Sequence, residues 1–212
     1  MIEKKFFDKV YENNNAPWTL EKPPKQLVEL IESRKIKPCK VIDIGCGDGF
    51  YSIYLASKGF DVLGIDFSER AIKNAKENAK KVGVNIRFLV MDAMNVNELK
   101  ESFDFVFEWA ILHGLMPKER EKYEKKISDI LNEGGKYLSV CFNDQDSHLG
   151  EPGIKHRVAP SESRMAGQEL YFSSLNEVKE LFSQHFKILE AKTIQMPTSK
   201  VHIGNFLLTE KI

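Results

Sequence analysis

The sequence predicts an α/β fold in which helices cover both faces of a mostly parallel sheet. Short apolar runs of strand length alternate repeatedly with amphipathic segments of helix length, and parallel neighbours need such crossover connections. The first apolar run ends in a glycine-rich turn that leads directly into a helix. With 42% hydrophobic and 29% charged residues among 212, the composition is that of a globular chain rather than a disordered or fibrous one.

The first half of the chain is predicted to hold three strands, each followed by a connection. Pro23 and Pro24 can open a helix ahead of the first strand. Ser68 can cap the helix after the second strand, and Gly83 can end that helix. The predicted strands span 40–44, 61–66 and 86–91, and a helix spans about 50–58.

The second half is predicted to continue the alternation and to end in a hairpin. Pro117 can begin a helix that ends near Gly134–Gly135. Ser174 and Glu177 form a capping-box pattern ahead of another helix. The predicted strands span 103–107, 136–142, 186–194 and 203–208, the last two as a hairpin, and a connection at 95–100 has room for a helical turn.

A single domain over 1–212 is expected, with an N-terminal arm at 1–22 and a lid insertion at 143–172. The lid is inferred because this polar segment is too long for an ordinary connection inside a compact domain. The chain has 31 Lys and Arg and 31 Asp and Glu, so no general excess of positive charge favours a nucleic-acid partner. No segment approaches the roughly 20 apolar residues of a membrane span. We expect a cytoplasmic protein without a membrane partner, a monomer or homodimer.

The cysteines give no sign of a disulfide framework or a metal centre. Cys39, Cys46 and Cys141 are odd in number and lack C-x-x-C spacing. The sequence therefore predicts no metal site, and the cysteines are expected to be small, mostly buried side chains.

The turn after the first strand, Asp43–Gly49, is suited to a cofactor without phosphate. Its glycines let the backbone turn sharply and let a ligand approach the main chain. A dinucleotide fingerprint would need its third glycine where Phe50 stands, and a P-loop would need a lysine followed by Ser or Thr. The turn carries two aspartates instead, which would repel phosphate. A cationic sulfonium with an amino group, as in S-adenosylmethionine, fits better.

Two further acids stand where the next strands end. Asp66 closes the second strand, and a carboxylate there can accept hydrogen bonds from both hydroxyls of a ribose. Asp92 follows the third strand, where it could accept a hydrogen bond from an adenine amino group. The order of acids at strands one, two and three predicts an adenosine-binding edge.

In this order and spacing, the segment 41–140 resembles class I methyltransferases that use S-adenosylmethionine. The glycine motif is Asp43–Gly49, the ribose acid is Asp66, the adenine motif is Asp92–Ala93, and the fourth motif is Phe103–Glu108. The resemblance covers about half the chain. It implies a Rossmann-like, seven-stranded, mostly parallel sheet whose last strand is antiparallel, which agrees with the predicted terminal hairpin.

A finer resemblance is to thiopurine-type and tellurite-resistance-type methyltransferases and related thiol or halide enzymes. It rests on Pro17–Trp18 and on the run Glu108–Leu115. It implies that Trp18 closes over the methionine end of the cofactor, where its ring can attract the sulfonium; a structural staple for the arm is the alternative role. The predicted cofactor-binding residues are Trp18, Asp43, Gly45, Cys46, Gly47, Asp66, Phe67, Asp92, Ala93 and Glu108.

The expected chemistry is in-line displacement, in which a lone pair on sulfur, oxygen or nitrogen attacks the methyl carbon. A thiol is partly ionised near neutral pH and needs no strong base, whereas an alcohol or amine would need help losing its proton. The candidate catalytic groups are His113 and Glu108, with His148 and His156 of the lid as further candidates, although each also has an ordinary structural role open to it. The predicted substrate-pocket residues are Trp109, His113 and Tyr171.

The sequence thus favours methyl transfer to a small molecule, with a thiol or other soft nucleophile slightly preferred. No Asn-Pro-Pro-Tyr or Asp-Pro-Pro-Tyr motif follows the fourth strand, and that motif marks enzymes that methylate base amines. Three alternatives remain: an O- or N-methyltransferase of a small metabolite, a protein methyltransferase, and a cofactor-binding interaction module without catalysis.

Overall fold

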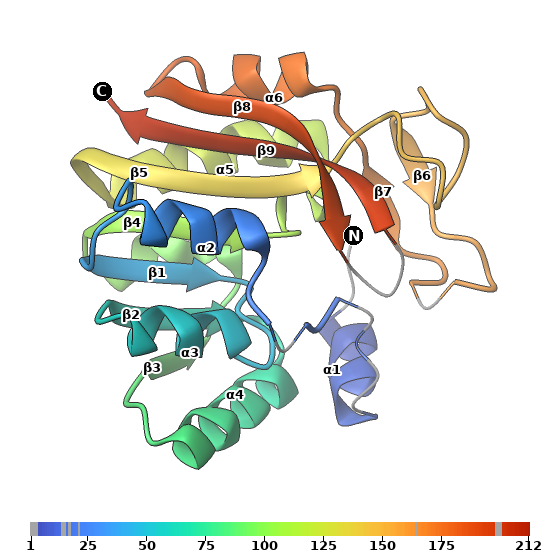
Figure 1. Ribbon diagram of the computed structural model, residues 1–212. Helices are drawn as coiled ribbons and strands as arrows, with labels where there is room; N and C mark the ends of the chain where they lie inside the picture. The colour runs from blue at the N-terminus through green and yellow to red at the C-terminus, as the bar shows by residue number, and fades with distance from the viewer. Residues whose placement is uncertain (1–3, 14–15, 17, 21, 164, 198–200) are drawn as a thin grey trace. The chain divides into compact units, whose positions relative to one another are not determined.

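The computed structural model describes residues 4–13, 16, 18–20, 22–163, 165–197 and 201–212 (Figure 1). The predicted Pro17 lies outside these residues, and parts of the arm and the lid do so as well. The chain divides into two compact units, Lys4–Ala93 and Met94–Ile212. The expectation of a single domain with an arm and a lid stays a prediction.

The N-terminal unit is a parallel three-stranded layer with helices. The strands follow the order β3-β2-β1, and Asp43 of β1 lies opposite Gly64 of β2. In α4, the Ser68 hydroxyl accepts a hydrogen bond from the Ala71 N–H, and Gly83 ends the helix in a left-handed conformation, as predicted. The elements are α1 (Lys4–Glu12), α2 (Lys25–Glu32), β1 (Lys40–Ile44), α3 (Phe50–Ser57), β2 (Asp61–Asp66), α4 (Glu69–Val82) and β3 (Arg87–Val90).

The C-terminal unit holds the remaining strands and the terminal hairpin. Strand β4 pairs with β5 in parallel, while β9 runs antiparallel to both β5 and β8. Its elements are η1 (Ala93–Leu99), β4 (Phe103–Trp109), η2 (Leu112–Gly114), α5 (Pro117–Ile130), β5 (Leu131–Phe142), β6 (His156–Val158), β7 (Glu169–Tyr171), α6 (Leu175–Phe182), β8 (Phe186–Pro197) and β9 (Val201–Lys211).

The predicted fold class is confirmed. The seven strands follow the order β3-β2-β1-β4-β5-β9-β8, mostly parallel, with the chain's last strand antiparallel. The Ser174 hydroxyl accepts a hydrogen bond from the Glu177 N–H, and the Glu177 carboxylate accepts one in return from the Ser174 N–H, so the predicted capping box is also confirmed.

Two elements differ from the prediction. Helix α5 ends at Ile130 rather than near Gly134–Gly135, because Leu131 already pairs with Phe103 of β4. The pairing then shifts, so that Phe105 lies opposite Lys136, and Gly134 takes a φ of 72° within the shift. The lid also contains regular structure, the short antiparallel pair β6–β7.

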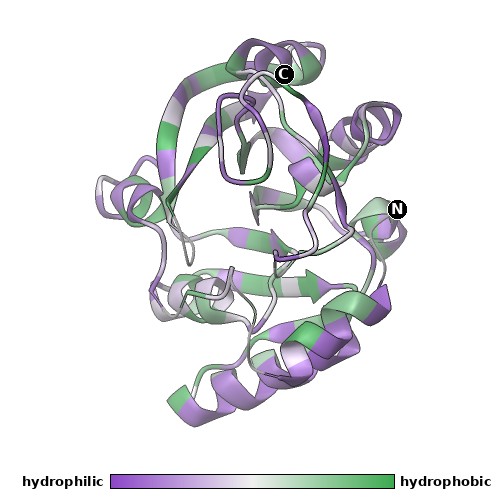
Figure 2. Ribbon diagram, turned by 90° about the vertical axis from the view of Figure 1, so that its right-hand side faces the viewer, coloured by the Kyte–Doolittle hydropathy of each residue, from purple (hydrophilic) through white to green (hydrophobic). Residues whose placement is uncertain are grey.

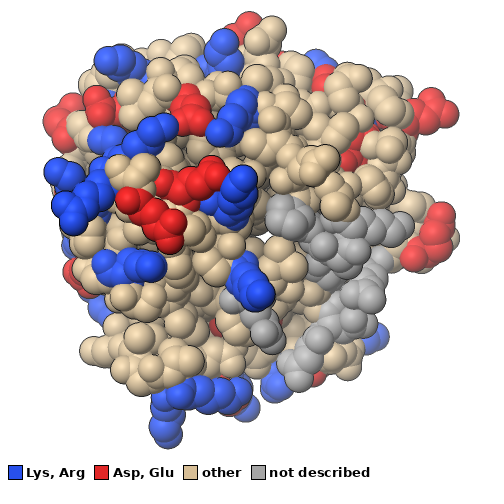
Figure 3. All heavy atoms as spheres, viewed as in Figure 1, with Lys and Arg blue, Asp and Glu red and all other residues tan. Residues whose placement is uncertain are grey.

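Hydropathy and charge are distributed as expected for a globular chain. The strands show bands of hydrophobic and hydrophilic residues, and the helices carry mixed stripes (Figure 2). In the N-terminal unit, Ile72, Ala75 and Ala79 of α4 form a buried cluster with Phe88 of β3. Basic and acidic side chains lie interspersed on the face drawn in Figure 3. Among the described residues, every helix is too short or too polar to cross a membrane.

Candidate cofactor and acceptor site

The glycine turn after β1 has the conformation that the sequence predicts. Gly45, Gly47 and Gly49 have φ values of 73°, 52° and 79°, in the left-handed region that favours glycine. The N–H groups of Gly45 and Cys46 both donate to the Ile65 carbonyl, at 2.8 and 2.9 Å, which fixes the start of the turn against β2. A Cβ at Gly47 would lie only 2.8 Å from the Tyr11 hydroxyl oxygen. The turn therefore has both the strained backbone and the close neighbour that require glycine.

Replacing Gly47 with alanine should destabilise the protein more than the same change at Gly134. Both residues have left-handed φ values, which cost an alanine about 1–2 kcal/mol, but a Cβ at Gly134 would meet nothing within 4 Å. We expect urea denaturation to give a loss near that strain for Gly134→Ala and at least about 1 kcal/mol more for Gly47→Ala, because the added methyl must also displace Tyr11. Equal losses would show that the Tyr11 contact is unimportant.

Asp66 holds this turn from the end of β2. The side chain is 6% exposed; Oδ2 accepts from the Gly47 N–H at 3.0 Å, and Oδ1 accepts from the Ser68 N–H at 2.9 Å. Burial raises the pKa of this carboxyl from 3.8 to about 6, against the lowering effect of the two backbone donors. A carboxylate has about four acceptor sites, so two remain for hydroxyl groups of a ligand.

Asp43 lies in the core beneath the turn. It is 2% exposed, and its Oδ2 accepts from the Ser52 hydroxyl of α3 at 2.6 Å. Burial raises its pKa to about 7, and the charge of Asp66 raises it further in the same direction. Asp43 therefore links β1 to α3, in addition to the cofactor contact predicted for it.

The N-terminal segment places aromatic side chains beside the glycine turn, and the sequence predicted only part of this group. The Trp18 indole N–H donates to the Tyr11 hydroxyl at 2.8 Å, and the ring of Phe7 lies 5.2 Å from those of both Trp18 and Phe67. Tyr11 is 3% exposed, although nothing near it in the sequence marks it as a site residue. Because Tyr11 contacts Gly47, this aromatic group places the predicted Trp18 close to the glycine turn.

The same segment is fastened to the start of α4. The Ser68 hydroxyl donates to Asp8 at 2.5 Å, and Thr19 donates to the Asp48 carboxylate at 3.0 Å. Asn74 of α4 donates to the other oxygen of Asp48 at 2.9 Å. The arm is thus hydrogen-bonded to the glycine turn at Asp48 and to the start of α4 at Ser68.

The remaining residues of this unit that the sequence predicted to bind the cofactor follow the ends of β1 and β3. Cys46 is half-buried, and burial raises the pKa of its thiol well above the usual range, so the thiol stays protonated. Asp92 and Ala93 follow β3, and the Asp92 side chain is exposed. The Met91 N–H donates to the Asp66 carbonyl at 2.9 Å, which ties the chain just before Asp92 to the end of β2.

In the C-terminal unit, Glu108 is fully buried at the end of β4. One oxygen accepts from the Ile111 N–H at 2.8 Å, and the other accepts from the Tyr137 hydroxyl at 3.1 Å and from the Ser139 hydroxyl. Burial raises its pKa to about 7, against these three donors. Both oxygens are used within the unit, so the carboxylate shapes the turn after β4; the predicted cofactor and catalytic roles of Glu108 stay predictions.

His113 follows that turn and is 6% exposed. Its Nδ1 accepts from the Phe142 N–H at 3.3 Å, and its ring stacks on that of Phe142 at 3.9 Å. Burial lowers its pKa to about 3, and the charge of Arg120 lowers it further in the same direction. At neutral pH the imidazole is therefore uncharged, with its proton on Nε2. The Nε2–H can donate a hydrogen bond, but the ring has no free basic nitrogen.

The other predicted pocket and lid residues also lie in this unit, and β7, which carries Tyr171, packs against η2, which carries His113. Trp109 is buried at 8% exposure, and the half-buried Tyr171 donates from its hydroxyl to Glu177 at 3.2 Å. His156 lies on β6 with its Nε2 3.7 Å from Glu169, whereas His148 approaches Asp146. The structure groups His148 with two residues that the sequence did not single out, Asp146 and His202.

Comparison with known proteins identifies a family. The family described as "Methyltransferase domain" matches residues 41–135. The chain is 30% identical over 152 residues to 2-heptyl-1-hydroxyquinolin-4(1H)-one methyltransferase of Mycobacteroides abscessus, covering 68% of this chain and 66% of the relative. It is 31% identical to TehB of Haemophilus influenzae, covering 56% and 41%, so the matches span two thirds or less of these relatives. An uncharacterized methyltransferase of Schizosaccharomyces pombe is 33% identical, covering 49% and 72%.

Two further likenesses extend over more of the chain. A probable thiol methyltransferase of Arabidopsis thaliana is 25% identical over 178 residues, covering 81% of this chain and 75% of the relative. A structure solved in a study of the conversion of a disulfide bond into a thioacetal group during echinomycin biosynthesis has a TM-score of 0.79 at 20% identity. It covers 99% of this chain and 93% of the other, which shows a shared fold.

Proposed function

We propose, from the premise that the chain belongs to the S-adenosylmethionine-dependent methyltransferases, that it transfers a methyl group from this cofactor to a small-molecule acceptor. The observation that carries the proposal is the acid-lined glycine turn, in which Asp66 keeps acceptor capacity beside the main chain of Gly47. The turn offers backbone and carboxylate groups rather than a phosphate-binding lysine. Such a set suits a nucleoside attached to a sulfonium.

The proposed cofactor contacts are those assigned from the sequence. Asp66 would accept hydrogen bonds from the ribose hydroxyls, and Gly45, Cys46 and Gly47 would present their main chain. Phe67, Asp92 and Ala93 follow the neighbouring strands and would hold the adenine. Trp18 would cover the methionine end, and Asp43 and Glu108 complete the proposed set. When bound, the cofactor supplies a methyl group that is already activated by its positive sulfur.

The protein's own contribution is to orient the acceptor and exclude water. Holding two reactants in near-attack geometry is worth roughly 7–11 kcal/mol. Trp109, His113 and Tyr171 are the proposed pocket residues. With a pKa of about 3 and its Nδ1 already accepting a hydrogen bond, His113 is suited to position an acceptor through its Nε2–H rather than to remove a proton.

That property of His113 supports a thiol or other soft nucleophile as the acceptor. A thiol ionises enough near neutral pH to react without a strong base. The likeness to a probable thiol methyltransferase supports the same class. A second candidate, an oxygen or nitrogen acceptor, is favoured by the likeness to the hydroxyquinolinone methyltransferase, with Glu108, His148 and His156 as the remaining groups for proton removal.

A small molecule is also a better proposed partner than a nucleic acid. The formal net charge is zero, and both signs of charge mix on the face in Figure 3. A cytoplasmic location and a monomeric or homodimeric state remain predictions of the sequence.

A panel of acceptors with methyl-labelled S-adenosylmethionine tests the proposed function. We expect label to appear in thiols or in other soft nucleophiles such as halides at rates above those for phenols or amines. Transfer to oxygen or nitrogen acceptors alone would contradict the sulfur preference and support the second candidate. Label incorporated only into proteins would favour a protein methyltransferase. Tight cofactor binding without transfer to any acceptor would favour an interaction module.

A further inference from the structure

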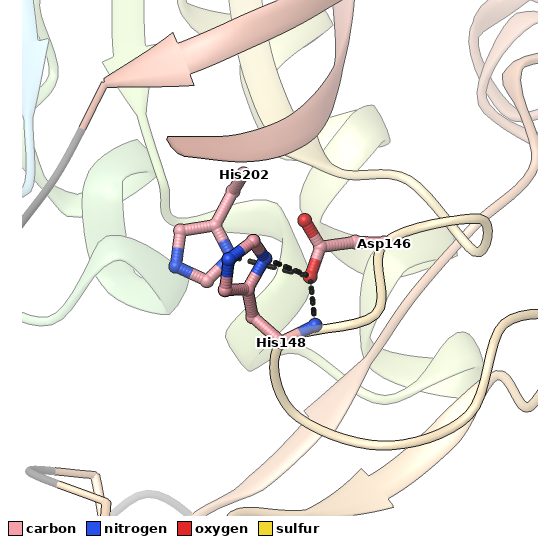
Figure 4. A group of neighbouring side chains, drawn as sticks. All are labelled: Asp146, His148 and His202. Atoms are coloured by element: carbon pink, nitrogen blue, oxygen red, sulfur yellow. Dashed lines mark hydrogen bonds and ion pairs between the residues drawn. The ribbon is translucent and has the colours of Figure 1, made fainter. Parts of the chain in front are cut away.

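Three side chains that the methyl-transfer proposal does not require as a group converge in the C-terminal unit. Asp146 and His148 come from the lid, and His202 comes from the start of β9 (Figure 4). Asp146 Oδ1 lies 3.2 Å from His202 Nδ1 and 3.5 Å from His148 Nδ1. Both imidazoles therefore turn the same kind of nitrogen toward one carboxylate oxygen, and the three donor atoms all lie within 4.8 Å of one another.

These separations resemble those of atoms that share a tetrahedral metal ion. Two ligands bonded to Zn²⁺ at roughly 2.0–2.1 Å lie about 3.3 Å apart. Hydrogen bonding alone would crowd the carboxylate, because Asp146 Oδ1 already accepts from the His148 backbone N–H at 2.8 Å. Two imidazole N–H groups would then compete for the acceptor capacity that remains on this oxygen. A cation between the three groups would use the lone pairs of all of them.

The carboxylate is held in place as metal-ligating carboxylates are. Asp146 is fully buried, and its Oδ2 accepts from the Ile203 N–H at 2.6 Å. Arg157 donates to the main-chain oxygens of Asp144 and Asp146, which fixes the loop that carries the carboxylate. The ring of Phe142 lies 4.7 Å from that of His202 and limits the rotation of the imidazole. Asp146 and His202 are therefore positioned before any ion binds.

We propose that Asp146, His148 and His202 bind one divalent transition-metal ion of the zinc class. Two imidazoles and one carboxylate suit Zn²⁺ and Co²⁺, whereas Mg²⁺ and Ca²⁺ prefer sets made only of oxygen. The His148 side chain is 35% exposed, which gives an ion a route from solvent and leaves room for water as a further ligand. Such an ion would connect the lid to β9. The sequence predicted no metal site, because His202 lies 56 residues from Asp146.

Cobalt gives the most direct test, since Co²⁺ takes the place of Zn²⁺ and absorbs visible light when bound by such ligands. The full chain, without an affinity tag and freed of metal by a chelator, should take up one equivalent of Co²⁺ with a visible absorption band that one equivalent of Zn²⁺ removes. His148→Ala, Asp146→Asn and His202→Ala should each weaken Zn²⁺ binding at least tenfold in calorimetry. His156→Ala, which removes the other lid histidine, should bind Zn²⁺ like the unmodified chain.

The variants also separate metal binding from folding. His148→Ala removes the most exposed of the three groups, so its circular dichroism should match that of the unmodified chain even if His202→Ala disturbs the lid. Zn²⁺ should raise the thermal midpoint of the unmodified chain and of His156→Ala, but not that of His148→Ala. The absence of a cobalt band, or equal Zn²⁺ affinity in His148→Ala and His156→Ala, would overturn the proposal and leave a hydrogen-bonded cluster. None of these readouts depends on methyl transfer.

Discussion

Replacing Asp66 with alanine should weaken the binding of S-adenosylmethionine about 100-fold or more. The carboxylate is proposed to accept hydrogen bonds from two ribose hydroxyls, and hydrogen bonds to a charged group contribute about 1.5–3 kcal/mol each. Loss of the carboxylate would also remove the hydrogen bond that Asp66 accepts from the Gly47 N–H at 3.0 Å, and the glycine turn would be held less firmly. Isothermal titration calorimetry with the cofactor or its demethylated product measures the effect directly.

The matched control for this change is Asp61→Ala. Asp61 begins the same strand that Asp66 ends, and its side chain is exposed. We expect the control to bind the cofactor like the unmodified chain. Because burial raises the pKa of Asp66 to about 6, cofactor affinity in the unmodified chain should also fall as the pH drops through 6, when the carboxylate gains a proton. Equal affinity in both variants would remove Asp66 from the site.

Replacing Glu108 with glutamine should make the protein more stable at pH 8 and flatten the pH dependence of its unfolding. Burial raises the pKa of Glu108 from 4.5 to about 7, so the folded protein favours the protonated form. The stabilisation linked to that proton is fully present below pH 4.5 and is lost as the pH rises through 7. The difference amounts to about 3 kcal/mol, since one pKa unit corresponds to about 1.4 kcal/mol.

Urea denaturation of the unmodified chain and of Glu108→Gln at pH 5 and pH 8 checks this expectation. A glutamine oxygen can still accept from the Ile111 N–H, and its amide can donate to the Tyr137 and Ser139 hydroxyl oxygens. Glu121→Gln serves as the control, because Glu121 lies exposed on α5 and should leave the pH dependence unchanged. A Glu108→Gln protein that is less stable than the unmodified chain at pH 8 would contradict the account of this buried acid.

The sequence predicted the N-terminal strands well because residues next to each strand mark where the strand ends. Strands β1 and β2 have the predicted bounds, since the glycine turn begins directly after Ile44 and β2 ends at Asp66, two residues before the Ser68 cap of α4. The start of β5 was missed because Leu131 fits the apolar stripe of α5 as well as a strand. Its pairing with Phe103 is a long-range contact that periodicity does not contain. The three-residue strands β6 and β7 are too short to show an alternation.

The candidate cofactor site was likewise predictable only in part. The glycines and Asp66 follow from spacing along one chain segment, so their place at the turn could be predicted. Tyr11 could not, because its role depends on a hydroxyl that meets Gly47 and the Trp18 indole only after folding. The group of Asp146, His148 and His202 could not be predicted for the same reason. His148 was a candidate only as a lid residue, and His202 on β9 has no local sequence signal.

The most direct test of the central claim is calorimetric titration of the unmodified chain with S-adenosylmethionine, NADH and ATP in turn. An acid-lined glycine turn without a phosphate-binding lysine should bind S-adenosylmethionine with a micromolar or lower dissociation constant and leave the two phosphate-bearing nucleotides unbound. Tight binding of NADH or ATP, or no heat with S-adenosylmethionine, would contradict the assignment of this turn.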